Sequence, residues 1–343
     1  MSFRQGVSTS PANLVSQISS FITTVGAPWS VIRSNGAGGD PAGTQLTIED
    51  TAAAVGTFYS MIPDNSPSND ANVQMQPHTA DSGIGASFFA HTGSPDSSGT
   101  AGSFSVMGNG LFSTTDQGFV GPHTQFFLFE GATGAGRYLH VVVEGTAGVY
   151  FHMWMGTIEK AGTFTGGQYT AASYAENANQ VQWPGQFAPP TTRGTQWFRF
   201  DNAFTSGSPG WREMNWFAFF QGSGSSLPAG VYEGGLNEFN QRTPFSPILC
   251  PFWSNDTPSV ISTNWKLAGH IPDCRLVSMD GREPGETITL GSDTWHIFPV
   301  HRKTTDGIST TSSAYANTNV AGPAPNNDSN MAGYAYREVG PTI

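Results

Sequence analysis

The chain has 343 residues, of which 11% are charged and 12% are aromatic. A typical soluble domain carries roughly 25% charged residues, and a disordered chain would be rich in charge and poor in aromatics. We therefore expect a folded protein with a weakly charged surface, a composition typical of proteins that contact other subunits. The net charge of −11 argues against nucleic-acid binding, which requires a basic surface to neutralise phosphates.

Cys250 and Cys274 are the only cysteines. They are too few for a disulfide framework or a zinc site of four cysteines, so we expect buried free thiols. The first residues contain no apolar stretch typical of a signal peptide, and no run approaches the roughly 18 apolar residues of a membrane span. The expectation is a protein that is neither exported by a signal peptide nor inserted in a membrane.

The first predicted element is a helix that begins after Ser10 and ends before Gly26. Ser10 can cap its first turn, Pro11 suits the first helical position, and Gly26 can end the last turn. Apolar residues at spacings of three and four give the helix one buried stripe: Leu14, Ile18, Phe21, Ile22 and Val25.

Short strands and loops follow the helix up to residue 136. The segment 124–130 is apolar enough to be a strand buried on both faces, and 131–136 is expected to link it to the next element. Loops rich in Ser, Gly, Pro and Asn are predicted at 63–72 and 94–102. The other strands predicted in this part of the chain are 29–33, 45–48 and 57–62.

The stretch 137–169 carries the clearest strand pattern in the chain. Two runs of alternating apolar residues flank a short loop at residues 146–148, which predicts a β-hairpin with Val143 opposite Phe151. In that register one face is entirely apolar, and a shift by one residue would destroy the match. The predicted structural core on this face consists of Leu139, Val141, Val143, Phe151, Met153 and Met155.

The opposite face of the hairpin holds the sharpest candidate for chemistry. His140, Glu144 and His152 share that face, and two histidines with one carboxylate resemble a zinc or non-haem iron ligand set. The alternative is that Tyr138, Tyr150 and Trp154 cover the histidines, which then form hydrogen bonds within a packed layer. We favour this alternative and expect no catalytic residue, no metal and no cofactor.

Other candidate sites have weaker patterns. His296 and His301 lie five residues apart on a strand, so they point to opposite faces and cannot share a metal without a bulge. Five tryptophans could form a platform that stacks on sugars, although such residues are more often core or interface anchors. They are Trp183, Trp197, Trp211, Trp216 and Trp253.

The remaining predictions concern residues 169–343. One or two helical turns are predicted at 169–177, and the two prolines of 245–253 restrict that segment to a sheet edge or a coil. A hairpin is predicted from 287–290 and 294–301, and a long loop at 304–330. The other predicted strands are 196–201, 214–221, 264–267, 275–279 and 332–337.

The predicted fold class is mainly β, with antiparallel sheets in a sandwich or barrel-like arrangement, an N-terminal helix and long loops. Residues 1–130 are expected to form an N-terminal α+β region and residues 131–343 a larger antiparallel β region, or the two together one domain.

Three segments of the chain resemble a known group of proteins. The pattern is a histidine and a glycine, then a lysine, then Gly-Gly-x-Tyr, followed at a distance by Trp-x-x-Phe-Pro and Gly-Tyr-Ala-Tyr. It is similar to virion structural proteins of tailed bacteriophages, from the neck, tail and baseplate, although Phe151 stands where the pattern often has arginine. The matching residues are His152, Gly156, Lys160, Gly166, Gly167, Tyr169, Trp295, Phe298, Pro299, Gly333, Tyr334, Ala335 and Tyr336.

The resemblance implies a non-enzymatic structural component of a tailed-phage virion, assembled as a ring-like homo-oligomer at the neck, collar or tail. Its partners would be copies of itself and other virion proteins, with no sequence-specific nucleic acid and no membrane. One alternative is a carbohydrate- or receptor-binding β module of the baseplate. Another is a metal-dependent hydrolase that uses His140, Glu144 and His152.

Overall fold

The protein is mainly β, with one helix and stacked antiparallel sheets. The computed structural model describes residues 2–34, 45–53, 56–64, 71–81, 105–109, 119–145, 149–177, 180–182, 197–200, 210–213, 245–253, 265–278, 282–299 and 332–340. Within these ranges it contains helix α1 (Pro11–Val25) and three sheets. The predicted fold class is confirmed in its sandwich-like form.

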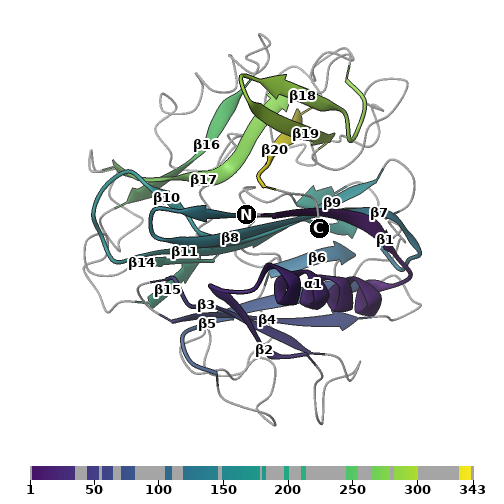
Figure 1. Cartoon of the computed structure of the whole chain (residues 1–343), viewed down its shortest axis with the longest axis horizontal. Helices are drawn as coiled ribbons and strands as arrows, with labels where there is room; N and C mark the ends of the chain where they lie inside the picture. The colour runs from purple at the N-terminus through teal and green to yellow at the C-terminus, as the bar shows by residue number, and fades with distance from the viewer. Residues whose placement is uncertain are drawn as a thin grey trace.

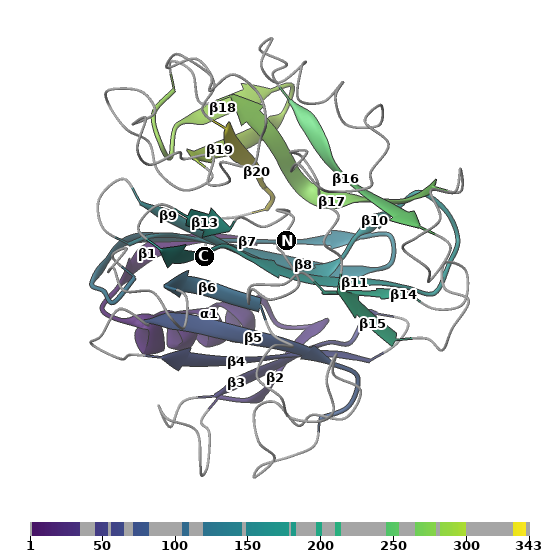
Figure 2. The same ribbon diagram turned by 180° about the vertical axis from the view of Figure 1, so that it is seen from behind.

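The central sheet has seven strands and lies between the two other sheets (Figures 1 and 2). Its order is β1, β7, β8, β9, β11, β14, β15. These strands span Ser2–Ser8, His123–Thr133, Gly136–Glu144, Tyr150–Thr157, Gly166–Ala172, Trp197–Phe200 and Gly210–Glu213.

The helix-side sheet packs against one face of the central sheet, and α1 lies between the two near β1 and β7 (Figure 1). Its order is β13, β12, β6, β5, β4, β3, β2, and only the pair of β6 and β12 is parallel among the described strands. These strands span Gln180–Gln182, Tyr174–Asn177, Ser105–Asn109, Asn72–His78, Thr57–Asp64, Leu46–Asp50 and Trp29–Arg33.

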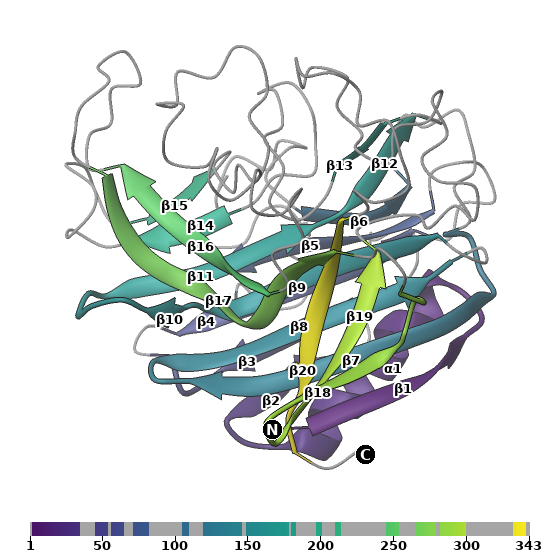
Figure 3. The ribbon, with the colours of Figure 1, turned by 90° about the horizontal axis from the view of Figure 1, so that it is seen from above.

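The outer sheet lies on the other face of the central sheet, and its strands cross those of the central sheet when seen from above (Figure 3). Its order is β10, β17, β20, β19, β18, and β16 pairs with β17. These strands span Glu159–Lys160, Trp265–Ser278, Ala332–Glu338, Asp293–Pro299, Thr287–Leu290 and Ser246–Trp253.

The helix forms as its sequence signals predict. The Ser10 side chain accepts a hydrogen bond from the Asn13 backbone N–H (3.2 Å), and the Gly26 N–H donates to the Ile22 carbonyl (3.0 Å). Gly26 has a φ of +69°, a conformation that glycine adopts without the strain of a side chain. The apolar stripe turns toward the sheets: Leu14, Ile18, Phe21 and Ile22 are buried.

The predicted register of the β8–β9 hairpin is confirmed. Val143 pairs with Phe151, and the Gly145 N–H donates to the Val149 carbonyl (3.0 Å). All six residues predicted as core on this hairpin are fully buried. Their face is turned to the helix-side sheet, where the rings of Phe151 and Phe119 meet edge to face at 5.0 Å.

The second face of the hairpin is buried as well, because the outer sheet covers it. A sheet covered on both sides has no polar face, so its strands consist of almost continuous apolar and aromatic residues. This explains why TQFFLFE in β7 and YFHMWM in β9 carry so few polar side chains.

Three predictions from local patterns were wrong. Residues 169–177 form strands β11 and β12 instead of helical turns, because β11 is paired between β9 and β14. The two short strands predicted at 264–267 and 275–279 are one strand, β17. Residues 131–136 are no linker, since β7 and β8 continue to a two-residue turn at Gly134 and Ala135.

Other predictions compare as follows. The strands β1 and β15 were not predicted. The strand β16 occupies the sheet edge that its prolines predicted, and the hairpin of β18 and β19 and the strand β20 are confirmed. The loops 94–102 and 304–330, the strand 214–221 and residues 65–70 of the loop 63–72 lie outside the described residues.

Position 130/131, expected to separate two regions, falls inside β7. Each seven-stranded sheet contains strands from both sides of this position, since β1 pairs with β7 and β12 pairs with β6.

We predict that Val141→Asp prevents soluble folding, because an unpaired carboxylate in this core costs several kcal/mol, comparable with a total stability of roughly 5–15 kcal/mol. The matched control is Val7→Asp in β1, where the side chain is 68% exposed and the change should stay within about 0.5 kcal/mol. Soluble yield and thermal unfolding by circular dichroism would test both. A normally folded Val141→Asp protein would contradict the assignment of the core.

Candidate functional site

A cluster of histidine, tyrosine and tryptophan side chains fills the interface between the central and outer sheets, which we call the outer interface. The His–Tyr cluster comprises His140, His152, Trp154, Tyr169, Tyr334 and Tyr336, each with 0% of its surface exposed. The first four residues come from β8, β9 and β11, and the two remaining tyrosines come from β20. The topology thus joins residues 182 to 184 positions apart in sequence.

The hydrogen bonds around Tyr336 have a defined direction. His152 Nε2 lies 2.9 Å from the Pro299 carbonyl, which can only accept, so this nitrogen carries a proton. In the neutral ring Nδ1 is then an acceptor, and it accepts a hydrogen bond from the Tyr336 hydroxyl at 2.7 Å. The Tyr336 oxygen in turn accepts from Trp154 Nε1 (2.9 Å). Each donor in this series of three hydrogen bonds meets an acceptor.

His140 is the less satisfied histidine. Its Nε2 lies 2.9 Å from the Tyr169 hydroxyl, and its Nδ1 is buried without a hydrogen-bond partner. Burial, followed by the proximity of His152, lowers the pKa of His140 from 6.5 to about 3. His140 is therefore neutral near pH 7.

The tyrosines and cysteines of the interface are also neutral near pH 7. Burial raises the pKa of the Tyr169, Tyr334 and Tyr336 hydroxyls well above their ordinary value. It also raises the pKa of the thiols of Cys250 and Cys274, which are buried and free as predicted. The result is an uncharged, dehydrated hydrogen-bonded layer, which can join two sheets but presents no side chain to a solvent-borne substrate.

Charged residues surround this layer at its margin. Asp273 accepts a hydrogen bond from the Tyr138 hydroxyl and pairs with Arg337 at 2.6 Å. Asp273 has a φ of +48°, the one non-glycine residue of positive φ in the described part of the chain. On the adjacent strand, His296 Nε2 lies 2.8 Å from Glu338, and its ring stacks on Phe3 at 4.8 Å.

A second buried polar group lies between the central and helix-side sheets, at the inner interface. Glu130 pairs with the Arg137 guanidinium and accepts from Trp29 Nε1 (3.1 Å). Asp50 accepts from the Arg137 backbone N–H (2.8 Å), and burial raises its pKa. Neither Glu130 nor Asp50 was singled out from the sequence, because no local motif marks the two carboxylates as neighbours.

The candidate metal ligands do not form a ligand set. His140 and His152 come together as the hairpin register predicts, but both ring nitrogens of His152 are hydrogen-bonded. Glu144 instead forms a hydrogen bond with Tyr150, and burial and this carboxylate raise the pKa of Tyr150. In the described ranges no three His, Cys, Asp or Glu side chains gather in a way that could hold a metal ion.

The other sequence candidates give no site either. Trp211, the one member of the five predicted platform tryptophans whose side chain is described, is buried with 6% exposed. His296 is placed in the outer sheet, and His301 lies outside the described residues. The described part of the chain also holds no helix long and apolar enough to cross a membrane.

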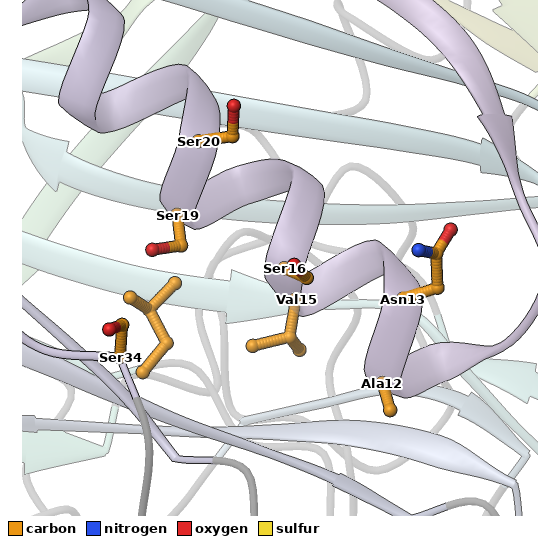
Figure 4. Close-up of a pocket in the computed structure, with 8 residues that line it drawn as sticks. Ala12, Asn13, Val15, Ser16, Ser19, Ser20 and Ser34 are labelled. Atoms are coloured by element: carbon orange, nitrogen blue, oxygen red, sulfur yellow. The ribbon is translucent and has the colours of Figure 1, made fainter.

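A hollow of about 510 Å³ lies beside α1, where the helix meets Ser34 and Leu46 (Figure 4). Its lining is short and uncharged, with Ala12, Asn13, Val15, Ser16, Ser19 and Ser20 from the helix. Among the described residues that line it no side chain is titratable, which is the character of a packing groove.

The residues that carry the sequence resemblance gather at and beside the outer interface. His152, Pro299 and Tyr336 form one hydrogen-bonded chain, and Tyr334 meets Trp154 edge to face at 4.9 Å. Gly156 has a φ of +137°, and a Cβ there would lie 2.4 Å from the Arg137 carbonyl oxygen. The pattern thus marks positions where the two sheets and their strands pack closely.

We predict that Tyr336→Phe lowers the free energy of unfolding by roughly 2–4 kcal/mol, because it leaves both Trp154 Nε1 and His152 Nδ1 without a partner. Tyr59→Phe is the matched comparison, since that buried hydroxyl donates to the Gly156 carbonyl (3.1 Å), and the loss of this hydrogen bond should cost about 1 kcal/mol. Urea unfolding of both variants would measure the two losses of unfolding free energy. Equal losses would show that the series of hydrogen bonds around Tyr336 adds no stability beyond a single one.

We also predict that Gly156→Ala costs roughly 3 kcal/mol or more, because the new Cβ meets backbone and the conformation is strained. Gly162→Ala has open space around it and should change stability by less than about 0.5 kcal/mol. Thermal unfolding of the pair would test this, and a neutral Gly156→Ala would contradict the close approach of β8 and β9.

No protein-family model and no curated protein sequence matches this chain.

Proposed function

We propose that the protein is a structural component of a tailed-phage virion, which assembles as a ring-like homo-oligomer at the neck, collar or tail. The observation that carries this proposal is the place of the resemblance residues. His152, Pro299 and Tyr336 join the central and outer sheets, and Trp295 and Ala335 pack in a second apolar cluster of the outer sheet. A pattern built from such positions identifies a shared architecture and not a shared catalytic site.

The surface composition supports an assembled protein. Only 11% of the residues are charged, and interface cores are depleted in charge relative to other protein surfaces. The sheets also provide pairing edges: within the described residues, β1 and β15 close the central sheet and each pairs on one side only. Unpaired strand edges are common sites of contact between subunits.

The role we propose is architectural. The central sheet of the three-layer body is covered on both sides. Such a body suits a ring, in which every subunit must present two different surfaces at a constant angle so that the assembly closes.

We predict that the purified chain forms a closed oligomer of defined mass. Analytical ultracentrifugation over a concentration series, with negative-stain imaging of the same sample, would show a single assembly of ring shape. A stable monomer at every concentration would contradict the proposal. Binding of that monomer to a glycan array would instead favour the receptor-binding alternative, and stoichiometric metal would favour the hydrolase.

A further inference from the structure

The two faces of the β8–β9 hairpin respond differently to acid. The face at the inner interface carries six apolar side chains, and at its end Arg137, which pairs with Glu130. The face at the outer interface carries His140 and His152, fully buried. Both histidines of the hairpin therefore lie against the outer sheet.

The geometry of the outer interface favours neutral histidines. His152 uses Nδ1 to accept from Tyr336, so a proton there would force the Tyr336 hydroxyl to turn and give up the hydrogen bond that it donates. A proton on His140 would place an unpaired charge in a dry layer, with the second histidine close by.

The charged groups on the packed elements are already engaged with other residues. Asp273 of β17 pairs with Arg337 of β20, Glu338 of β20 pairs with His296 of β19, and Glu144 of β8 bonds to Tyr150 of β9. On β17, Arg275 lies over the Trp295 ring at 5.7 Å, and the half-buried His270 has its pKa lowered mainly by burial. The thiols and tyrosines of the interface stay neutral at acidic pH.

The chain order allows the outer sheet to move as a unit. Its strands β16 to β20 all come from residues 246–338, and the two-residue β10 is the one strand that an earlier part of the described chain contributes. We propose that the outer sheet is an acid-sensitive cover, and that protonation of His140 and His152 opens the outer interface while the inner interface stays closed. This inference does not depend on the proposed role in a virion.

The direction of the effect follows from linkage. A histidine exposed by opening titrates near pH 6.5, whereas the closed interface holds the pKa of His140 near 3. The closed state is thus favoured above pH 6.5 and loses this advantage as the pH falls toward 3. At pH 4.5 the opening equilibrium should rise on the order of 100-fold through His140.

The two cysteines provide a specific probe of opening. Cys250 and Cys274 are the only thiols of the chain, both are buried, and both belong to the outer sheet. The Cys274 thiol is hydrogen-bonded to Tyr336, inside the interface. The experiment measures labelling by a dipyridyl disulfide, which reacts with thiols in acid, from pH 7.5 to 4. Far-UV circular dichroism is recorded on the same samples, and rates are corrected with the denatured chain.

We expect the corrected labelling rate to rise below pH 6.5 while the β signal is unchanged. The variant His140→Gln/His152→Gln cannot be protonated at these positions and should stay protected. His123→Gln is the matched control, because His123 is a buried histidine away from this cluster, with Ser8 and Phe119 as partners, and it should open as the unaltered protein does.

The proposal is overturned if the thiols become reactive only where the β signal is lost. It is also overturned if the double glutamine variant opens at the same pH as the unaltered protein. If that variant does not fold, the pH profiles of the unaltered chain still decide whether the thiols become reactive before the β signal is lost.

Discussion

Burial of the β8–β9 hairpin on both faces is the constraint on which the rest of the structure depends. The two faces are covered by different means. At the inner interface the six core side chains of the hairpin are apolar and their contacts require no direction, while the ion pair of Glu130 and Arg137 lies beyond them. At the outer interface Trp154, Tyr336 and His152 meet through hydrogen bonds of fixed direction.

The difference has a physical consequence for specificity. Apolar contacts tolerate changes in packing at modest cost, whereas a buried donor without an acceptor costs roughly 1–3 kcal/mol. The outer sheet can therefore dock in one way, the way that brings Pro299 and Tyr336 to His152. This agrees with the crossed arrangement of the outer strands over the central ones (Figure 3), which apolar contacts alone would not define.

Local signals in the sequence predicted the elements that local physics determines. The cap at Ser10 and the glycine at 26 defined α1, and matched faces defined the register of Val143 and Phe151. The strands β11 and β17 were misread because pairing with distant strands decides them. In β17, Gly269 lets the chain approach the Glu159 carbonyl, where a Cβ would lie only 2.0 Å away.

The candidate site was predicted in part. Alternation placed His140 and His152 on one face, and the aromatic residues beside them indicated a packed layer. The partners Tyr336 and Pro299 could not be found, because strand periodicity states which face a residue occupies but not which distant strand will cover it. The missing information is topological, since the order β17, β20, β19 puts the closing strand in the middle of the outer sheet.

The position of β20 has a consequence for synthesis. His152 leaves the ribosome 184 residues before Tyr336, an interval of roughly 10–40 s at synthesis rates of about 5–20 residues per second. Through that interval the nascent hairpin exposes a face rich in aromatic residues that has no native partner yet. The outer interface is therefore completed only by the strand that is translated last.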